Sequence, residues 1–490
     1  MDFTIPAVDL RIIGPVLMVC GWGLLLMILD LFLPARRRYW FAWLTLIGLI
    51  PALALTVSQW GQTGGTFTPA GGTPMVVMDN FSHFLNIILL LTGIITVLIS
   101  INYLRQINLE RAEYYMLLLF SLSGMMLMGM ANDLILVFLA LELLSIPLYI
   151  MAGFAHPKPE SEESAMKYFL LGAFSSGFLV FGIALIYGAT GSTALPAVLA
   201  SVGTGGALGM AGIAMLLVGL GFKVAAVPFH MWTPDVYEGA PTAVTAFMSV
   251  GAKAGGFAAL LRVFVIALPD LVAVWAPAVA VLAALTMIVG NVIALAQQNI
   301  KRMLAYSSIA HAGYILMAVA AVQGSDQGVS AALFYLLTYL FSNLGAFAVV
   351  IAVERANGEG VTLEDYKGLA RRSPALAAAM AFFMLSLTGI PPTAGFAGKF
   401  YVFRAVIEAD LIWLVLVGAV TTVISAYFYL RVVYLSYMFE GEGAVDRYPV
   451  LNTAVALTVL ATLLLGVLPG PWFELARQAT LQGVLTLVGG

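Results

Sequence analysis

Apolar runs long enough to cross a lipid bilayer recur along the whole of this chain. Of its 490 residues, 62% are hydrophobic and only 10% are charged, whereas soluble domains carry about 25% charged residues. A helix needs about 20 apolar residues to cross the hydrocarbon core, and barrel strands instead alternate over roughly ten residues. The runs here are long and continuous, so the sequence predicts an all-α polytopic membrane protein.

About fourteen transmembrane helices satisfy this length criterion. We expect them to centre near Val19, Ile47, Ile88, Met125, Glu142, Leu179, Leu217, Lys253, Leu285, His311, Leu340, Leu387, Val420 and Leu460. The first apolar run, from Leu10 to Leu33, is too long for the core of a signal peptide and has no basic leader. We therefore expect it to remain as a helix.

Basic residues gather in alternate loops, which predicts the orientation of the chain. They follow the first, third, fifth, ninth and eleventh spans, at Arg36, Arg37, Arg38, Arg105, Arg111, Lys158, Lys167, Lys301, Arg302, Lys367, Arg371 and Arg372. The loops between them, such as residues 59–74 and 190–206, lack lysine and arginine; Arg404 is an exception. Loops rich in lysine and arginine stay in the cytoplasm. We expect a multi-pass protein of the cell inner membrane with both termini on the outer side.

Composition also argues against several kinds of partner and cofactor. A formal net charge of −3 gives no reason to expect a nucleic-acid partner. The single cysteine, Cys20, excludes a disulfide framework and a cysteine-ligated iron–sulfur cluster. The histidines fall in four separate segments, which argues against a haem held by two of them: His83, His156, His230 and His311. We expect no redox centre and no cofactor in this chain, and lipids around it.

Two of the spans contain helix-breaking residues beside a lysine. Pro228 follows Lys223, and Gly389-Ile390-Pro391-Pro392 precedes Lys399. Proline removes a backbone donor, which is tolerated at membrane depth only inside protein or beside water. Paired broken helices in the two halves of a chain indicate inverted repeats with a pathway at their interface.

We therefore predict two inverted five-helix repeats, from Tyr114 to about Val265 and from Leu271 to about Tyr437, with discontinuous seventh and twelfth helices. The chain is a single membrane domain in this interpretation. Its four parts are three N-terminal helices in residues 1–110, the repeats in residues 111–268 and 269–440, and a C-terminal helix in residues 441–490.

Five ionisable side chains interrupt the apolar runs, and we call them the relay residues: Glu142, Lys223, Lys253, His311 and Lys399. A charge at the bilayer centre costs about 2.5–3.5 kcal/mol, so such residues mark ion or proton pathways. Burial favours the neutral form of lysine and a nearby carboxylate favours the charged form. A switchable contact between Glu142 and Lys223 would thus load and unload one proton. Histidine accepts a proton on one ring nitrogen and releases one from the other.

Each relay residue also has a purely structural interpretation. Glu142 and Lys223 can form a static salt bridge, and His311 can be a satisfied core residue. Lys253 can reach for the interface, although small residues surround it, and Lys399 can pair with Glu408 or Asp410. Lower-ranked candidates are Asp30 and Asp133 near span ends, Asp79 as a helix cap, and His230, Asp235 and Glu238 as an entrance or a polar turn. The many methionines, phenylalanines and tyrosines are interpreted as packing and lipid-facing residues.

Several segments together resemble one family. The stretch from Lys223 to Thr242 reads K-V-A-A-V-P-F-H-M-W-T-P-D-V-Y-E-G-A-P-T, and Leu139 to Pro147, Ser307 to Tyr314 and Gly389 to Phe400 accompany it. These blocks resemble the antiporter-like, proton-translocating membrane subunits of complex I, the NADH:quinone oxidoreductase. Their spacing and the chain length are similar to those of the N-type subunit. The resemblance spans roughly Tyr114 to Tyr437.

The resemblance implies a function in which the relay residues carry protons across the membrane. The chain would be a non-redox subunit of an enzyme, and quinone reduction elsewhere in the complex would drive the protons. Sibling antiporter-like subunits and a peripheral redox arm would be its partners, and those partner subunits would hold FMN, iron–sulfur clusters and quinone.

Two other classes of function fit the residues less well. One is an autonomous cation/proton antiporter, or a subunit of one. Sodium prefers several oxygen ligands, whereas a path with one central carboxylate and several lysines suits protons. The other is a passive structural subunit, for which loss of Lys223 would change nothing.

Overall fold

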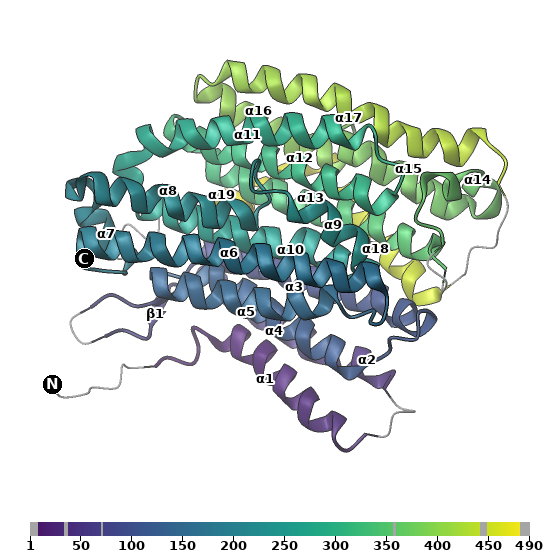
Figure 1. The fold of residues 1–490 in the computed structure, drawn as a ribbon, viewed down its shortest axis with the longest axis horizontal. Coiled ribbons are helices and arrows are strands. Elements are labelled where there is room, and N and C mark those ends of the chain that lie inside the picture. The colour runs from purple at the N-terminus through teal and green to yellow at the C-terminus, as the bar shows by residue number, and fades with distance from the viewer. Residues whose placement is uncertain (1–7, 34–37, 70–71, 356–358, 442–447, 481–490) are drawn as a thin grey trace.

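The computed structural model describes residues 8–33, 38–69, 72–355, 359–441 and 448–480. Across these ranges long helices run side by side along the longest axis of the molecule (Figure 1). The predicted all-α, polytopic class is confirmed. Arg36 and Arg37, on which part of the orientation prediction rests, and the last ten residues of the predicted C-terminal part lie outside the described residues.

Among the described residues, twelve helices are long and apolar enough to cross a membrane. They are α2 (Trp40–Ser58), α3 (Asn80–Gln106), α4 (Ala112–Met130), α5 (Leu134–Ala152), α6 (Pro159–Thr190), α8 (Gly206–Lys223), α10 (Thr242–Leu261), α11 (Val272–Ala294), α12 (Ile300–Ala320), α13 (Gly328–Val353), α17 (Ile412–Met438) and α18 (Pro449–Val467). Two shorter apolar helices are α1 (Gly14–Asp30) and α15 (Pro374–Thr388). The other α-helices are α7 (Leu195–Ser201), α9 (Trp232–Gly239), α14 (Leu369–Arg372), α16 (Ala394–Glu408) and α19 (Pro469–Gln478).

A small hairpin at one end of the bundle was not predicted. Strands β1 (Gly64–Thr66) and β2 (Val76–Met78) pair antiparallel, with Gly65 opposite Val77. They lie in the connection between α2 and α3, at the end of the bundle that also holds α7 (Figure 1). The sequence marks this stretch only as a loop without basic residues, because strands of three residues leave almost no periodic signal.

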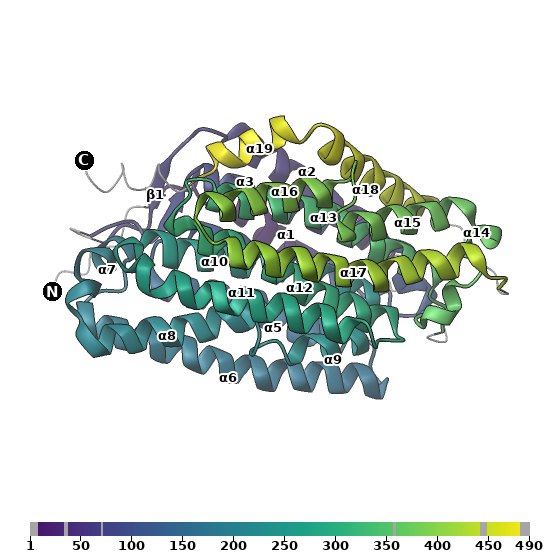
Figure 2. The ribbon, with the colours of Figure 1, turned by 90° about the horizontal axis from the view of Figure 1, so that it is seen from above.

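Three helices form the centre of the bundle. In α10, α12 and α13, 94% of the residues in an apolar stretch of 18 residues are buried inside the protein. The corresponding share is 33% in α6, α17 and α18. Figure 2 shows the three central helices between α6 and α8 on one side and α18 on the other. The polar residues of α10, α12 and α13 therefore face protein on every side, where neighbouring helices can supply hydrogen-bond partners.

Both predicted helix interruptions are present. α8 ends at Lys223 and α9 begins at Trp232, so the chain leaves the helical path around Pro228. α15 ends at Thr388, and α16 begins at Ala394 after the Gly389-Ile390-Pro391-Pro392 segment. Gly389 caps α15 with a φ of 92°, a left-handed conformation that glycine adopts without strain.

Close backbone contact joins α11 to α12. A Cβ atom built on Gly313 of α12 would lie 2.8 Å from the backbone nitrogen of Met287 and 3.0 Å from the carbonyl oxygen of Ala283, both on α11. Small residues permit such approaches in membrane proteins, where helix association depends on van der Waals packing. This contact fixes the position of α12, the helix that carries His311.

We predict that Gly313→Val separates α11 from α12 and destabilises the protein. Overpacking of this kind costs about 1–3 kcal/mol. Thermal unfolding of the detergent-solubilised protein measures the effect. Gly21→Val is the matched control, because a Cβ on Gly21 meets nothing within 4 Å. Equal melting temperatures for the two variants would contradict the close contact.

Candidate functional site

The relay residues lie on five different helices, and four of them are almost fully buried. Lys223 ends α8, Lys253 lies on α10, His311 on α12 and Lys399 on α16, and their side chains are at most 5% exposed. Glu142 lies on α5 and is half-buried. The four buried groups therefore depend on protein atoms, or on water held between the helices, for hydrogen bonds.

Neutral oxygens surround the ammonium group of Lys223. Its Nζ donates to Ser145 Oγ at 2.7 Å and to Tyr168 OH at 3.3 Å, and lies 5.3 Å from the centre of the Tyr168 ring. Ser145 stands three residues after Glu142 on α5, and residues three apart share a helix face. Ser145 thus places the lysine close to Glu142 without a direct contact between them.

Glu142 is bonded to α6 and not to the lysine. Ser176 Oγ donates to Glu142 Oε1 at 2.6 Å. A cavity of about 10 Å³ is lined by Ser176 and Lys223, which is about the space that one water occupies. The static salt bridge, the structural alternative for this pair, is therefore not formed in the described structure, because the partners of both side chains are hydroxyl groups.

Lys253 bonds to the backbone of α12. Its Nζ donates to the carbonyl oxygen of Ser308. The lysine is 1% exposed, so it does not reach the interface, as its structural alternative required. One turn further along α10, a Cβ on Gly256 would lie 3.4 Å from Lys223 Cβ. Lys223 therefore packs against the part of α10 that carries Lys253.

Tyrosines hold both ring nitrogens of His311. Nδ1 lies 2.7 Å from Tyr335 OH, and Nε2 lies 3.1 Å from Tyr429 OH. Ser307 Oγ lies 2.5 Å from the same Tyr429 hydroxyl. The interpretation of the tyrosines as packing material is wrong for this group, since buried phenol groups connect His311 to α13 and α17.

Lys399 uses the carbonyl group that the helix interruption frees. Its Nζ donates to the carbonyl oxygen of Thr388 at 2.9 Å and to Thr422 Oγ1 at 3.2 Å. It also lies 4.5 Å from the centre of the Tyr314 ring, and Tyr314 OH lies 2.9 Å from the same Thr422 oxygen. A cation above an aromatic face is stabilised by the ring quadrupole.

The structural alternative for Lys399 is not formed. Glu408, one of the two partners considered from the sequence with Asp410, accepts from Arg404 Nε at 2.9 Å and from Ser325 Oγ at 2.9 Å. The bonds of Lys399 go to Thr388 and Thr422 instead. Lys399 is thus a buried lysine without a carboxylate among its hydrogen-bond partners.

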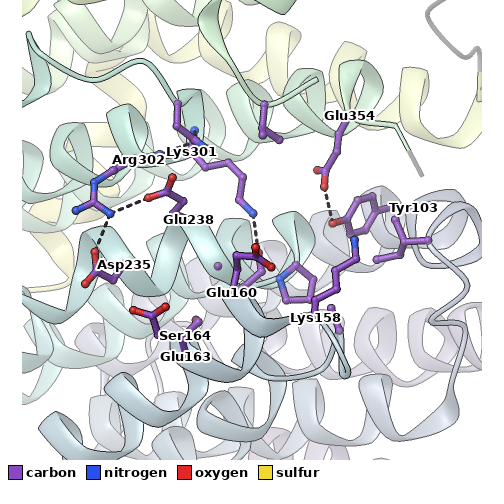
Figure 3. Close-up of a pocket in the computed structure, with 17 residues that line it drawn as sticks. Tyr103, Lys158, Glu160, Glu163, Ser164, Asp235, Glu238, Lys301, Arg302 and Glu354 are labelled. Carbon is purple, nitrogen blue, oxygen red and sulfur yellow. Dashed lines mark hydrogen bonds and ion pairs between the residues drawn. The ribbon is translucent and has the colours of Figure 1, made fainter. Parts of the chain in front are cut away.

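A polar cavity of about 640 Å³ opens at one end of the bundle (Figure 3). We call it the polar cavity; its ionisable lining residues are Lys158, Glu160, Glu163, Asp235, Glu238, Lys301, Arg302 and Glu354, with Tyr103 among the others. Arg302 Nη1 donates at 2.7 Å to both Asp235 and Glu238. Lys301 Nζ donates to the carbonyl oxygen of Ala240 at 2.7 Å. Asp235 and Glu238, both on α9, therefore line this cavity, whereas His230 is not among its lining residues.

A buried ion pair at the other end of α10 was missed. Arg262 Nη2 donates to Asp79 Oδ1 at 2.7 Å, and Arg262 Nε donates to the carbonyl oxygen of Gly129 at 2.9 Å. Asp79 also caps α3, as predicted, by accepting from the backbone N–H of Ser82 at 2.8 Å. Asp133 caps α5 in the same way. Arg262 ends an apolar helix, and its sequence position resembles that of an interfacial arginine, so the pattern gave no signal of burial.

In the part of the chain that the structure describes, no three histidine, cysteine, aspartate or glutamate side chains gather to hold a metal ion. The site consists of amines, one imidazole, one carboxylate and many hydroxyls. These groups exchange protons and form continuous hydrogen-bond paths when water joins them.

Comparison with known proteins gives a consistent result. Residues 131–425 match the family described as "NADH:quinone oxidoreductase/Mrp antiporter, TM". NADH-quinone oxidoreductase subunit N of Chloroflexus aggregans is 49% identical over the full length of both chains. Subunit N of Trichlorobacter lovleyi is 46% identical over 96% of this chain and 97% of the relative.

Solved structures share the fold. A chain of respiratory complex I from Thermus thermophilus with bound aureothin superposes with a TM-score of 0.80 at 38% identity, over 94% of this chain and 99% of that chain. A chain of the Mrp complex from Dietzia sp. superposes with a TM-score of 0.86 at 21% identity, over 98% of this chain and 100% of that chain. The second likeness concerns the fold alone.

We predict that Gly389→Ala displaces Lys399. Its Cβ would lie 2.9 Å from Lys399 Cδ, and the left-handed backbone adds strain of about 1–3 kcal/mol. Gly61→Ala is the matched control, since Gly61 also has a positive φ, of 83°, but a Cβ there meets nothing within 4 Å. A high-resolution density map of the Gly389→Ala protein should show Lys399 Nζ away from Thr388; an unmoved lysine would contradict the prediction.

Proposed function

The chain belongs to the family of NADH:quinone oxidoreductase and Mrp antiporter membrane proteins, within it to the subunits N of complex I, and we propose that its relay residues form the path by which it moves protons. It is a proton-translocating membrane subunit of a proton-pumping enzyme complex. The observation that carries the proposal is that Lys223, Lys253 and Lys399 are buried and bond to neutral oxygens.

Neutral partners are the reason that the three lysines suit proton transfer. A carboxylate partner fixes the charge of a lysine, whereas hydroxyl and carbonyl oxygens can bond to a lysine without a fixed countercharge beside it. Ser145, Ser308 and Thr388 supply such oxygens to the three lysines. Each lysine can therefore exist as the ammonium ion or as the neutral amine. A change in a neighbouring charge is enough to shift the balance between these two forms.

Glu142 controls the first lysine in this scheme. With its carboxylate bonded to Ser176, as in the described structure, it stands one hydroxyl and one small cavity away from Lys223. Rotation toward Ser145 brings the negative charge close to Lys223 and stabilises the ammonium form. Rotation back to Ser176 moves the carboxylate away from Lys223. The attraction for the ammonium group then weakens, and the proton can pass on toward Lys253.

His311 and Lys399 form the second half of the path. His311 receives a proton on one nitrogen and releases one from the other, and the hydroxyls of Tyr335 and Tyr429 stand at these nitrogens. Tyr314 and Thr422 then lead to Lys399. The path thus crosses the bundle from α5 to α16 through its most buried helices.

The helix layout supports a repeat organisation with fourteen crossings. To the twelve long helices we add α1, and α15 with α16 as one discontinuous crossing. α4 to α10, within residues 111–268, form the first five-helix repeat, and α11 to α17, within residues 269–440, form the second, inverted one. The interruptions at Pro228 and Gly389 are counterparts, because each stands beside a relay lysine. Residues 1–110 and 441–490 flank the repeats.

The polar cavity marks the cytoplasmic face in this proposal. Lys158, Lys301 and Arg302 line it, in agreement with the rule that basic loops stay inside. Both termini then lie on the outer side of the inner membrane. The chain is part of a complex I assembly, and its partners are sibling antiporter-like membrane subunits and a peripheral arm that holds FMN, iron–sulfur clusters and the quinone site. The chain itself holds no cofactor in this scheme.

We predict that Lys223→Ala and Glu142→Gln each lower coupled proton transfer. The reason is that each removes one member of the switchable pair. In assembled complex reconstituted into vesicles, we expect the NADH-driven proton flux to fall about tenfold, which corresponds to about 1.4 kcal/mol on the barrier. Lys367→Ala is the control, because Lys367 pairs with Glu364 away from the relay. If the Lys223→Ala complex kept the proton flux of the wild type, Lys223 would not be part of the path.

We predict a smaller effect for Ser145→Ala. The variant removes the shortest hydrogen bond of Lys223, but the bond from Lys223 Nζ to Tyr168 OH remains. Proton flux should fall several-fold while assembly of the complex is retained. Ser123→Ala is the matched control, since this buried hydroxyl on α4 donates only within its own helix, to the carbonyl oxygen of Leu119. Equal fluxes in the two variants would count against the role of Ser145.

A further inference from the structure

A line of polar side chains between α10 and α13 ends at Lys253, and apart from this lysine the proposed path does not use it. On α10 it consists of Thr242, Ser249 and Lys253, which stand seven and four residues apart and so share one face of the helix. On the side of α13 it consists of Glu354, Asn343 and Tyr339, with spacings of eleven and four residues. We call this line the α10–α13 seam. It leads from the polar cavity to Lys253.

Glu354 stands at the cavity end of the seam. It lines the polar cavity, yet it is only 9% exposed. Its Oε1 accepts from Tyr103 OH at 3.2 Å (Figure 3). Its Oε2 accepts from Thr242 Oγ1 at 2.5 Å. Among the described residues, the hydrogen bonds to this carboxylate thus come from hydroxyl groups and not from a cation.

Buried polar atoms without a protein partner mark the other end of the seam. Asn343 Nδ2 donates to Ser249 Oγ at 2.6 Å, but Asn343 Oδ1 has no partner. The hydroxyls of Ser308, Tyr237 and Tyr339 are also without one, although both tyrosines approach Ser308. Buried polar groups are nearly always satisfied. Since the two tyrosines approach Ser308, whose carbonyl oxygen binds Lys253, and Asn343 lies beside Ser249 on the same face of α10, we place water molecules along this part of the seam.

The middle of the seam also needs water. Thr242 and Ser249 are about 10 Å apart along the helix, at 1.5 Å per residue. Between them Thr245 offers a hydroxyl, which lies 2.9 Å from the carbonyl oxygen of Tyr237. Side chains alone do not span this distance. Proton transfer along the seam therefore needs water between Thr242 and Ser249, and Thr245 and Tyr237 offer polar atoms that can hold it.

We propose that Glu354 takes protons from the polar cavity and that the α10–α13 seam delivers them to Lys253, as a second access to the relay that bypasses Glu142 and Lys223. This proposal rests on the relay role of Lys253. The carboxylate gains a proton from cavity water and releases it to water in the seam. Neutral Lys253 gains that proton and becomes the ammonium ion that bonds to Ser308. No electron moves, and no other reactant is needed.

The test is Glu354→Gln in the assembled complex in vesicles. The amide keeps the size of the side chain but carries no exchangeable acid proton. We expect NADH-driven proton flux to fall about fivefold, and the ratio of fluxes in H₂O and D₂O to rise, because proton delivery becomes slower than the steps after it. A merely structural role would not change this isotope ratio. Glu364→Gln is the control, since Glu364 is exposed and pairs with Lys367 outside the polar cavity.

Asn343→Leu tests the seam at a second place. It removes the carbonyl oxygen without a partner and the bond to Ser249, and it keeps a branched side chain with the same number of heavy atoms. We expect the same fall in flux and the same rise in isotope ratio, and no further loss when it is combined with Glu354→Gln. If the Glu354→Gln complex fails to assemble, Asn343→Leu decides the question alone.

Lys253→Ala separates the two proposals. If its flux equals that of the wild type, the relay role of Lys253 falls and the seam proposal falls with it. If Lys253→Ala lowers the flux but Glu354→Gln and Asn343→Leu keep wild-type flux and isotope ratio, only the seam proposal is overturned and the relay remains.

Discussion

A positive charge inside a bilayer must find its solvation within the protein, and the structure is arranged around that requirement. Four of the relay residues are almost completely buried, and each one bonds to hydroxyl or carbonyl oxygens on a neighbouring helix or across a helix interruption. Neutral oxygens satisfy an ammonium group without fixing its charge as a carboxylate would. The most buried helices, α10, α12 and α13, are therefore also the ones that carry the polar interior.

Helix interruptions have the same physical purpose. A continuous helix uses almost all of its carbonyl groups in its own hydrogen bonds, whereas the end of α15 leaves the carbonyl oxygen of Thr388 for Lys399. Gly389 permits the sharp turn that exposes this oxygen, and it also leaves room for the lysine, since any Cβ there would collide with Lys399 Cδ. One residue thus determines both the backbone path and the place of the charge.

The sequence allowed the fold class and the two interruptions to be predicted, because a charge or a proline within twenty apolar residues is a sharp local contrast. The same contrast singled out the relay residues, whose part in proton transfer stays a proposal. It did not reveal Tyr335, Tyr429 or Arg262, because a tyrosine resembles packing material and an arginine at a span end resembles an interfacial one. Nor could it show that Glu142 bonds to Ser176 and not to Lys223, since side-chain rotation decides between partners that a helix places at similar distances.

The two ends of α10 are both held by buried polar contacts. At one end Thr242 bonds to Glu354 and to Tyr103, and at the other Arg262 bonds to Asp79 and to the backbone of α4. Sliding this helix would break a buried ion pair, at about 3–5 kcal/mol, while rotating a side chain demands far less. The helix that carries Lys253 is thus a fixed support. On the proposed path, a shift of charge or of water orientation can therefore reach Lys253 without any sliding of this helix.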